Sequence, residues 1–415
     1  MKRKIPSVPA DGKAMPIVLF GACDRHNLGD LLFPHIAAAL LAPRAVVVAG
    51  LAARDLTPFG GHRVCAIGEV LRAWPGAPLI HAGGELLACD AWEAAVMLLA
   101  PEEAPGVIAQ YDGKHERFEW ARQVLGRADR APYCLGQSES SRPDGRDLLA
   151  TIQSGASRPL ANASSCSPRH ECRGLRLTRG QSPQDGARIF LGVGGVDLDR
   201  REPALREEVL AKLRAADWIG VRDSLTLAHL SAAGIAATLM PDSAVLTAEL
   251  FGERIRARGE GGEVAAARAA FPQGYLAVQF AASLGDDATL ARIAEGLARQ
   301  AADRGIVFFR AGAAPWHDDL DVYCRAAACL PGARVFQSLD IWDICALIAA
   351  SAGFAGSSLH GRIVAEAFGV PVIEGVVPVG LKAVAWRETW AGVDAIAAFR
   401  LAFSESGCSI RESGR

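Results

Sequence analysis

The sequence lacks the features that mark several large classes of protein. It holds 44 Lys and Arg against 46 Asp and Glu, a net charge of −2, whereas nucleic-acid-binding proteins carry a clear excess of basic side chains. No run reaches the roughly 18–20 apolar residues of a membrane helix. The basic N-terminal segment MKRKIPSVPADGK is not followed directly by the apolar core of a signal peptide. We therefore expect a soluble, cytoplasmic protein that neither crosses a membrane nor binds nucleic acid.

Paired cysteines are also missing. Ten cysteines are present, but no C-x-x-C pair occurs. Cys65, Cys324 and others lie in apolar or helical patterns, where a free cysteine behaves as a small hydrophobic residue. Cys166, His170 and Cys172 lie close together in a polar stretch, yet this cluster has no second paired half. We predict free thiols and no metal site.

Apolar runs alternate with Ala/Leu-rich helical patterns through most of the chain. Half of the 415 residues are hydrophobic. Most runs, among them PIVLFGA, RAVVVAG, YLAVQF and VPVIEG, are continuously apolar, as is typical of strands covered on both faces of a parallel sheet. The helical patterns between them indicate an α/β fold of doubly wound, Rossmann-like domains. Because the chain exceeds the length of one ordinary domain, we predict two such domains that face a cleft.

Composition shifts divide the chain. We assign residues 15–255 to an N-terminal Rossmann-like domain, 274–395 to a C-terminal one, and 396–415 to a tail. The charged, glycine-bearing segment RARGEGGEVAAARAAFPQG is the predicted linker between the domains. Residues from about 136 to 186 are rich in Ser, Arg, Gly and Pro and interrupt the first domain. A loop this long is either disordered or a lid over a substrate.

Open α/β sheets bind ligands beyond the carboxyl ends of their strands, and SSLHGR occupies such a position. Ser357 or Ser358 can cap the helix that follows, and the free N–H groups at its start, including that of Gly361, favour an anion. His360 extends the buried stripe of this helix toward the cleft, where its protonated ring can bind an anion or act as a general acid. Arg362 can add a second positive charge. Alternatively, His360 only caps the helix, and Arg362 forms an ion pair with Glu366, four residues later.

A second loop, WIGVRDSLTLAHLSAAGI, places Arg222 at the end of a strand. Asp223 or Ser224 caps the helix that follows, and Gly234 ends it. An arginine at this position can bind a carboxylate or a phosphate through two parallel hydrogen bonds. A surface ion pair is the alternative role for Arg222.

The first predicted strand runs into a polar loop and then a helix. Gly29 permits the close approach of a ligand to the backbone, and Asn27 belongs to the same candidate binding loop. Asp30 is either the N-cap of the helix or a group that handles hydroxyls, because a carboxylate at a helix start repels a bound phosphate. Asp24 is an alternative for that second role, and His26 is a weaker candidate.

A fourth loop, LIHAGGELL, exposes backbone at Gly83 and Gly84, with Glu85 beside them. No G-x-G-x-x-G with a downstream acid supports a nicotinamide site, and we predict no bound cofactor. Asp242 and the pair His317–Asp318 are further polar positions beside predicted strands.

Taken in order, NLGD, HAGGE, LGVGG, GVRDSLTLAHLSAAGI, MPDSA and SSLHGRIVAEAFGVPVI resemble the polysaccharide pyruvyltransferase family. The resemblance covers about residues 16–382 apart from the polar insert. It implies a GT-B-like fold and transfer of a pyruvyl group from phosphoenolpyruvate to two hydroxyls of a saccharide, which forms a pyruvate ketal and phosphate. Phosphoenolpyruvate is then a co-substrate, the acceptor is a free or lipid-linked saccharide, and the implied process is polysaccharide (exopolysaccharide) biosynthesis. The N-terminal domain is then expected on the acceptor side and the C-terminal domain on the phosphoenolpyruvate side.

The resemblance also implies roles for single residues. The family's histidine corresponds to His360 and the arginine of its R-D-x-S segment to Arg222, and both are expected to hold or activate phosphoenolpyruvate. Some members carry an arginine where this chain has Ser358, and a lysine often found after the last strand has only Lys382 as a loose counterpart. His360 is the candidate acid that protonates the methylene carbon. The candidate groups to orient or deprotonate the sugar hydroxyl are Asp30, Asp24 and Glu85.

Two other functions fit the same sequence. A GT-B glycosyltransferase would hold the diphosphate of a nucleotide sugar at the same helix start, but no clear acidic ribose ligand follows the SSLHG helix. A non-catalytic saccharide-binding relative would keep the fold with a dispensable His360. Affinity for phosphoenolpyruvate distinguishes the pyruvyltransferase from both.

Overall fold

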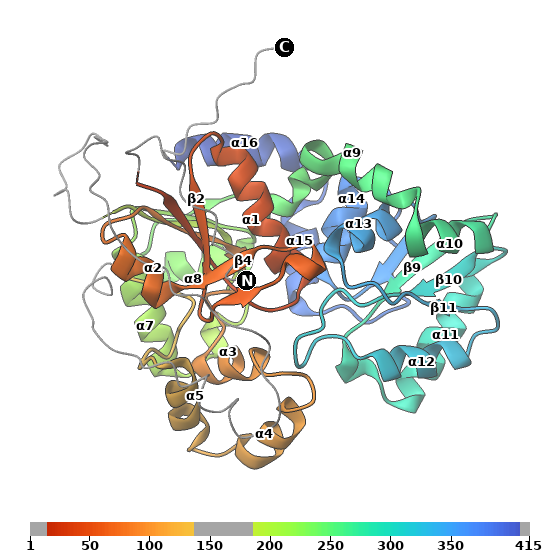
Figure 1. The fold of residues 1–415 in the computed structure, drawn as a ribbon, viewed down its shortest axis with the longest axis horizontal. Coiled ribbons are helices and arrows are strands. Elements are labelled where there is room, and N and C mark those ends of the chain that lie inside the picture. The colour runs from red at the N-terminus through yellow and green to blue at the C-terminus, as the bar shows by residue number, and fades with distance from the viewer. Residues whose placement is uncertain (1–14, 137–185, 407–415) are drawn as a thin grey trace, which may run out of the picture.

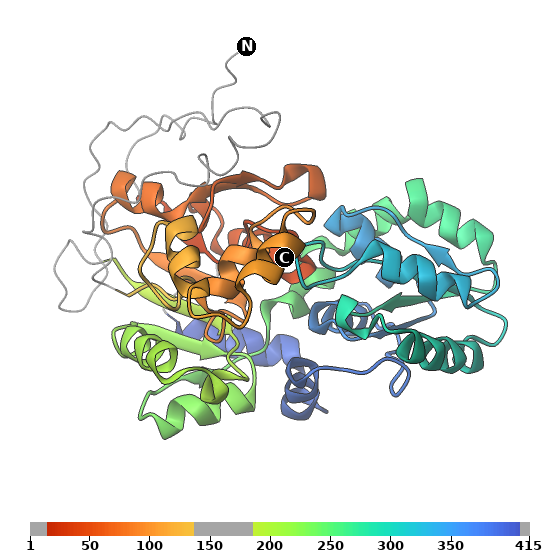
Figure 2. The same ribbon diagram turned by 90° about the horizontal axis from the view of Figure 1, so that it is seen from below.

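The computed structural model describes residues 15–136 and 186–406. The cluster at Cys166, His170 and Cys172 and nearly all of the predicted insert lie outside these residues. The described chain forms two sheets of parallel strands surrounded by helices, and the two halves lie side by side (Figures 1 and 2). This confirms the predicted α/β class with two facing Rossmann-like domains in a GT-B-like arrangement. In the two described stretches, no helix has the length and apolar character needed to cross a bilayer.

The first sheet, counted over the described residues, has eight strands in the order β3-β4-β2-β1-β5-β6-β7-β8. Neighbouring strands are parallel except at the edge, where β3 is antiparallel to β4. Successive strands are added on both sides of β1, which is the doubly wound pattern. The strands are β1 (Ile17–Phe20), β2 (Val46–Gly50), β3 (Arg54–Asp55), β4 (Arg63–Ala66), β5 (Leu79–Gly84), β6 (Arg188–Val193), β7 (Trp218–Val221) and β8 (Thr238–Leu239).

Helices cover both faces of this sheet. Side chains of β1 alternate between the two faces, so that Ile17 and Leu19 join one apolar cluster and Val18 and Phe20 join another. This arrangement explains why the strands read as continuous apolar runs. The helices of this half are α1 (Leu28–Leu41), α2 (Ile67–Ala73), α3 (Ala91–Met97), α4 (Ala104–Tyr111), α5 (Arg117–Leu125), α7 (Pro203–Arg214) and α8 (Ser224–Ala232), with the 3-10 turns η1 (Thr57–Phe59), η4 (Leu198–Arg200) and η5 (Ser243–Leu246).

The second sheet, in the part of the chain that is described, has four parallel strands in the order β11-β10-β9-β12. Its strands are β9 (Tyr275–Gln279), β10 (Gly305–Phe308), β11 (Arg334–Val335) and β12 (Gly353–Gly356). The helices around it are α11 (Asp287–Ala301), α12 (Leu320–Ala328), α13 (Ile341–Ala349) and α14 (Leu359–Ala367), with the 3-10 turn η6 (Ala282–Leu284).

One apolar cluster is shared by the two halves. It contains Ile17 and Leu19 of the first sheet together with Tyr275 and Ala277 of the second. Helix α1 packs on both α13 and α14 of the other half. Because an apolar interface of this kind opposes relative domain motion, the loops at the strand ends of the two sheets are held in a defined relation.

Three predicted segments differ from the structure. The predicted linker is not extended chain, because it runs through α9 (Thr247–Gly259) and α10 (Gly262–Ala270), although it does connect the two sheets. The predicted strand VPVIEG is reduced to an isolated bridge between Val372 and Phe354, and Pro371 within it has no N–H to donate to a ladder. The short antiparallel pair β3–β4 was not predicted.

The C-terminal segment returns to the first half. Helix α15 (Leu381–Trp390) contacts α8, and α16 (Ala395–Glu405) lies over the first half (Figure 1). Phe399 and Phe403 are fully buried in the shared cluster, and Arg400 pairs with Glu249 of α9 at 2.5 Å. Residues 396–406, predicted as part of a tail, therefore pack as a helix, while the domain bounds themselves stay a prediction.

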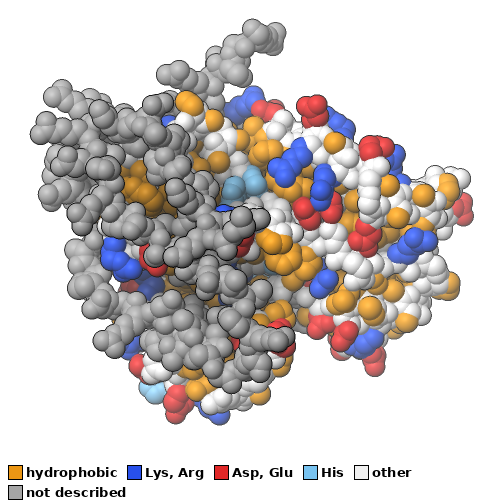
Figure 3. Space-filling model, in the orientation of Figure 1, with side chains coloured by type: hydrophobic (Ala, Val, Ile, Leu, Met, Phe, Trp, Pro, Cys, Tyr) orange, Lys and Arg blue, Asp and Glu red, His pale blue; other side chains and the backbone are white. Residues whose placement is uncertain are grey.

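The described surface carries charges of both signs. Figure 3 shows acidic and basic side chains interspersed on the visible face, with hydrophobic side chains between them. This mixture agrees with the net charge of −2.

Candidate functional site

Four residues of the candidate site, three of them polar, follow neighbouring strands of the first sheet. Glu85 comes directly after β5, Gly194 directly after β6 and Arg222 directly after β7, while Asp242 lies three residues after β8. These four strands are consecutive parallel neighbours. The sheet order therefore brings to one edge four residues that are far apart in the sequence.

Arg222 lies between two carboxylates. Its Nη2 is 2.5 Å from Oε2 of Glu85, and its Nη1 is 3.3 Å from Oδ2 of Asp242. Arg222 is 2% exposed. Burial opposes its charge, but Glu85 and Asp242 outweigh burial and raise the pKa of Arg222. The pair with Glu85 leaves no room at Gly194, where an added Cβ would lie 2.5 Å from Glu85 and 2.7 Å from Arg222.

His360 reaches the same carboxylate from the second half. Its Nε2 lies 3.4 Å from Oδ2 of Asp242, an ion-pair distance without the geometry of a hydrogen bond. Asp242 is fully buried, and its Oδ1 accepts a hydrogen bond from the N–H of Ala244. Burial alone would raise the pKa of Asp242, but His360 and Arg222 hold that pKa below its ordinary value. One carboxylate oxygen thus joins Arg222 and His360, the two residues that the sequence singled out.

The imidazole of His360 rests against the start of α1. A Cβ added at Gly29 would lie 2.2 Å from its Nδ1, and the ring of Phe33 meets it edge-on with centroids 5.2 Å apart. Gly83 and Gly84, at φ +75° and +86°, adopt the left-handed conformation that favours glycine. These glycines let the end of β5 pass close to Phe33 and Asp30. The predicted loops around Gly29 and Gly83 therefore meet beside His360.

Asp30 is not the cap of α1. Asn27 is the N-cap, and its side-chain oxygen accepts a hydrogen bond from Gly29 at 3.1 Å, so the expected capping role of Asp30 is wrong. Asp30 is 8% exposed, and its Oδ2 lies 3.7 Å from Nε of Arg25. Asp24, by contrast, is held inside the first half by Ala52 and by the hydroxyl of Tyr133, and burial raises its pKa.

The serines of SSLHG hold the start of α14. Ser358 is the N-cap and accepts a hydrogen bond from Gly361 at 3.1 Å, while Oγ of Ser357 accepts one from Ala281 at 3.2 Å. The N–H of Ser358 donates to Oε1 of the buried Gln279 at 2.8 Å. The backbone and side chains of both serines are thus already used within the protein.

Gln279 extends this network to Asp318. Its Nε2 donates to Oδ1 of Asp318 at 2.7 Å, and Oδ2 of Asp318 accepts from Ala311 and Gly312. Burial raises the pKa of Asp318 to about 7. The neighbouring His317 has its pKa lowered to about 4, first by burial.

Arg362 makes the ion pair expected with Glu366 and a closer one with Glu374. Its two terminal nitrogens lie 2.7 and 3.0 Å from the two oxygens of Glu374, whereas Glu366 is 3.8 Å away. Among the described residues, no hydrogen bond or ion pair joins Arg362 to Arg222 or His360. Its predicted ligand role stays a prediction.

The loop before α1 is attached to the second half. Nδ1 of His26 accepts a hydrogen bond from Ala313, and its Nε2 donates to the carbonyl of Leu339 at 2.7 Å. The N–H of Leu28 donates to the carbonyl of Ala311 at 2.7 Å. These contacts cross between the halves and fix Gly29 beneath His360.

Lys382 lies near the same edge. Burial opposes the charge of Glu85, but Arg222 first and then Lys382 lower its pKa below the ordinary value. Lys382 is exposed at the first turn of α15. Sequence reasoning gave Asp242 and Lys382 little weight, because each is a single polar residue whose partners come from other segments. The position of Asp242 twenty residues after Arg222, following the next strand, was the available signal.

Residues 175–376 match the family model described as polysaccharide pyruvyl transferase. The chain thus contains a polysaccharide pyruvyl transferase domain. Members of this family are transferases. The matched region contains Arg222, Asp242 and His360, whereas Glu85, Gly29 and Lys382 lie outside it. No curated protein matches this pyruvyl transferase.

Solved structures similar to this pyruvyl transferase are distant. UDP-GlcNAc 2-epimerase from Neisseria meningitidis bound to UDP-GlcNAc has 12% identity and a TM-score of 0.38, with 95% of each chain covered. UDP-N-acetylglucosamine 2-epimerase from Rickettsia bellii has 10% identity and a TM-score of 0.42, with 95% of this chain and 94% of that one covered. An alpha-glucosyltransferase in complex with UDP has 7% identity and a TM-score of 0.39, with 95% and 91% covered. Similarities this distant do not indicate a shared function.

Proposed function

We propose that the protein transfers a pyruvyl group from phosphoenolpyruvate to two hydroxyls of a saccharide, with formation of a pyruvate ketal and phosphate. Family membership supports the class of reaction. The observation that carries the proposal for this chain is the contact of Arg222 and His360 with one buried oxygen of Asp242. We infer that the reaction takes place in the cytoplasm, during polysaccharide biosynthesis.

Phosphoenolpyruvate carries a carboxylate and a phosphate, so its site needs several cationic groups. Arg222, His360 and Lys382 supply positive charge, and the start of α14 adds the positive end of a helix dipole. Arg222 uses one hydrogen bond for each carboxylate, and a guanidinium has five N–H donors. It therefore keeps donors for the anion.

His360 is the proposed general acid. Asp242 lies 3.4 Å from Nε2 and positions the ring, which leaves Nδ1 as the nitrogen for the substrate. In the first step the methylene carbon takes the proton of His360, and the first sugar oxygen attacks C2 as its hydroxyl proton leaves. In the second, the C–O bond to phosphate breaks, the second sugar oxygen attacks C2, and its proton leaves with phosphate. One proton enters the methyl group and two leave the hydroxyls, so the reaction balances.

Asp30 is the proposed base for the sugar hydroxyl. Glu85 is engaged by Arg222 at 2.5 Å and by the N–H of Val196 at 2.8 Å, and Asp24 is held by two hydrogen bonds of its own. Asp30 has only the looser 3.7 Å contact with Arg25 as an ion pair in the described residues. Its position next to Gly84, beside the loop that supports His360, suits a group that receives a proton.

Ligand-induced thermal stabilisation tests this function. Phosphoenolpyruvate should raise the melting midpoint of the purified protein with increasing occupancy, and nucleotide sugars should not. His360→Gln and Arg222→Lys should abolish the stabilisation, and Arg325→Ala, which changes an exposed arginine of the second half, should retain it. Stabilisation by a nucleotide sugar with none from phosphoenolpyruvate would overturn the proposal in favour of a glycosyltransferase.

Turnover separates an enzyme from a binding relative. With a panel of saccharides, the protein should release phosphate from phosphoenolpyruvate only when an acceptor is present. His360→Gln should lower the rate by about 10²–10⁴-fold, the usual contribution of a general acid. Binding of phosphoenolpyruvate with no turnover of any saccharide, and no effect of His360→Gln, would indicate the non-catalytic relative.

A further inference from the structure

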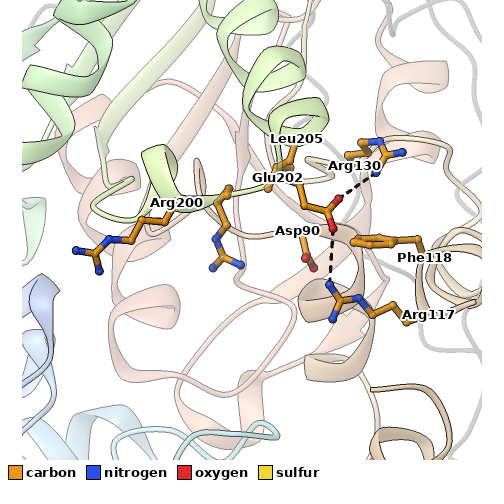
Figure 4. Close-up of a pocket in the computed structure, with 8 residues that line it drawn as sticks. Asp90, Arg117, Phe118, Arg130, Arg200, Glu202 and Leu205 are labelled. Atoms are coloured by element: carbon orange, nitrogen blue, oxygen red, sulfur yellow. Dashed lines mark ion pairs between the residues drawn. The ribbon is translucent and has the colours of Figure 1, made fainter. Parts of the chain in front are cut away.

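A cavity lies in the first half, away from the candidate site. Its volume is about 190 Å³. Four arginines and two acids line it, namely Arg117, Arg130, Arg200, Arg201, Asp90 and Glu202 (Figure 4). Four positive charges less two negative ones leave a lining of +2. A concave site with convergent cations suits an anionic ligand.

Two of these arginines are only loosely paired. Arg117 and Arg130 point toward Glu202 from opposite sides (Figure 4), at 3.9 and 3.6 Å. Both distances exceed a hydrogen bond, and within the described ranges no side chain accepts one from either guanidinium. Arg201, by contrast, donates to Glu93 at 2.7 Å. Arg117 and Arg130 therefore retain donors for a ligand.

One aromatic ring supports the same surface. The guanidiniums of Arg117 and Arg130 lie 4.8 and 5.6 Å from the ring centre of Phe118, which limits their motion.

One loop joins this cavity to the candidate active site. Gly194 lies against Glu85 and Arg222, and the N–H of Val196 donates to Glu85 at 2.8 Å. The same loop continues through η4 to Arg200 and Glu202 at the cavity. The candidate site and the cavity therefore share this loop.

We propose that this cavity binds an anionic group of a saccharide, either a carboxylate or a phosphate, through Arg117 and Arg130. Glu202 occupies the position of the anion in the free protein, and the ligand displaces it from the two guanidiniums. The binding of anions follows from the cavity alone, whereas the identity of this saccharide as the acceptor rests on the proposed function.

Direct binding to the purified full chain tests this site without phosphoenolpyruvate. The probes are a glucuronate-containing disaccharide, a hexose 1-phosphate and a neutral glucose disaccharide, measured by calorimetry. Arg117→Ala should lower the affinity for an anionic probe about tenfold, the loss expected for a charged hydrogen bond. Glu202→Gln should raise the affinity about threefold because it removes the competing carboxylate. Arg122→Ala, on the same helix but outside the cavity, is the matched control and should change nothing.

Each outcome has a definite meaning. Binding of the disaccharide alone identifies a carboxylate ligand, and binding of the hexose phosphate alone identifies a phosphate. Equal binding of the neutral probe, or an effect of Arg122→Ala as large as that of Arg117→Ala, would overturn the proposal. If Arg117→Ala does not fold, the threefold rise in affinity for the anionic probe that is expected in Glu202→Gln tests the proposal instead. If Arg117→Ala raises the KM of an acceptor while the KM for phosphoenolpyruvate stays constant, the cavity binds the acceptor of the reaction. If Arg117→Ala changes neither KM, the cavity binds anions but does not hold the acceptor, and the proposed function of the active site is unaffected.

Discussion

Arg222 and the pair Arg117 and Arg130 show two ways in which one protein uses arginine. Arg222 is 2% exposed and has carboxylates at 2.5 and 3.3 Å. The side chains of Arg117 and Arg130 are 27% and 45% exposed and share one glutamate at 3.6–3.9 Å. A buried charge needs close partners because desolvation is costly. An exposed charge keeps its hydration, so it can exchange one partner for another.

This difference separates a cation that is fixed in place before its ligand arrives from cations that can exchange one partner for another. The buried set of Arg222, Asp242 and His360 has its geometry fixed before any substrate arrives, which is what proton transfer requires. The cavity arginines gain their full set of hydrogen bonds only with an anion present. Substitutions in the two regions should therefore have different consequences for stability and for binding.

The largest expected effect is on folding. Arg222→Ala leaves Glu85 and Asp242 buried without their shared cation, so the free energy of unfolding should fall by about 3–5 kcal/mol. Arg130→Ala removes an exposed charge and should change it by less than about 0.5 kcal/mol. Chemical denaturation followed by tryptophan fluorescence measures both. Equal losses in the two variants would contradict the contrast between the regions.

Asp242→Asn tests the shared carboxylate through activity and pH. Without the carboxylate the imidazole of His360 loses the ion-pair partner that positions it, so kcat should fall about 10²-fold. The lowered pKa of Asp242 also stabilises the wild type fully above its ordinary value of 3.8, and this stabilisation is lost as pH falls through the lower folded pKa. Melting midpoints measured from pH 5 down to pH 3 should decline less steeply in Asp242→Asn than in the wild type. Parallel declines would show that Asp242 is not held by these cations.

Gly29→Ala tests the seat of His360. The added Cβ would lie 2.2 Å from Nδ1, so the imidazole must move, and kcat should fall about tenfold because the acid is displaced. Gly106→Ala is the control, since a Cβ there meets nothing within 4 Å. It should leave activity unchanged and stabilise the protein by about 0.4–1 kcal/mol. Unchanged turnover in Gly29→Ala would separate His360 from the reaction.

The smallest effect is expected at an exposed cation of the active site. Lys382→Ala should raise the KM for phosphoenolpyruvate about threefold at low salt, and the difference should shrink in 0.5 M salt, since exposed charges are screened. The corresponding change in Arg222→Lys should persist in salt because that position is buried. A salt-independent effect of Lys382→Ala would place its ammonium in a buried contact with the ligand.

Local patterns in the sequence were enough for the two-sheet fold and for most of the candidate positions. Strand ends are visible where apolar runs stop, and caps such as Ser358 and Asp223 act on N–H groups within three residues. The sequence therefore placed Arg222 and His360 at strand–helix junctions, and the family resemblance followed from the order of those segments.

Only the tertiary structure decided which of these junctions meet. The order of β5 to β8 brings Glu85 and Asp242 to Arg222, and α14 brings His360 to Asp242. Packing also gave Arg362 the partner Glu374 and assembled the arginine cavity from three segments distant in the chain. Periodicity and capping depend on neighbours within a few residues, whereas these contacts depend on strand order and helix packing, which no local pattern records.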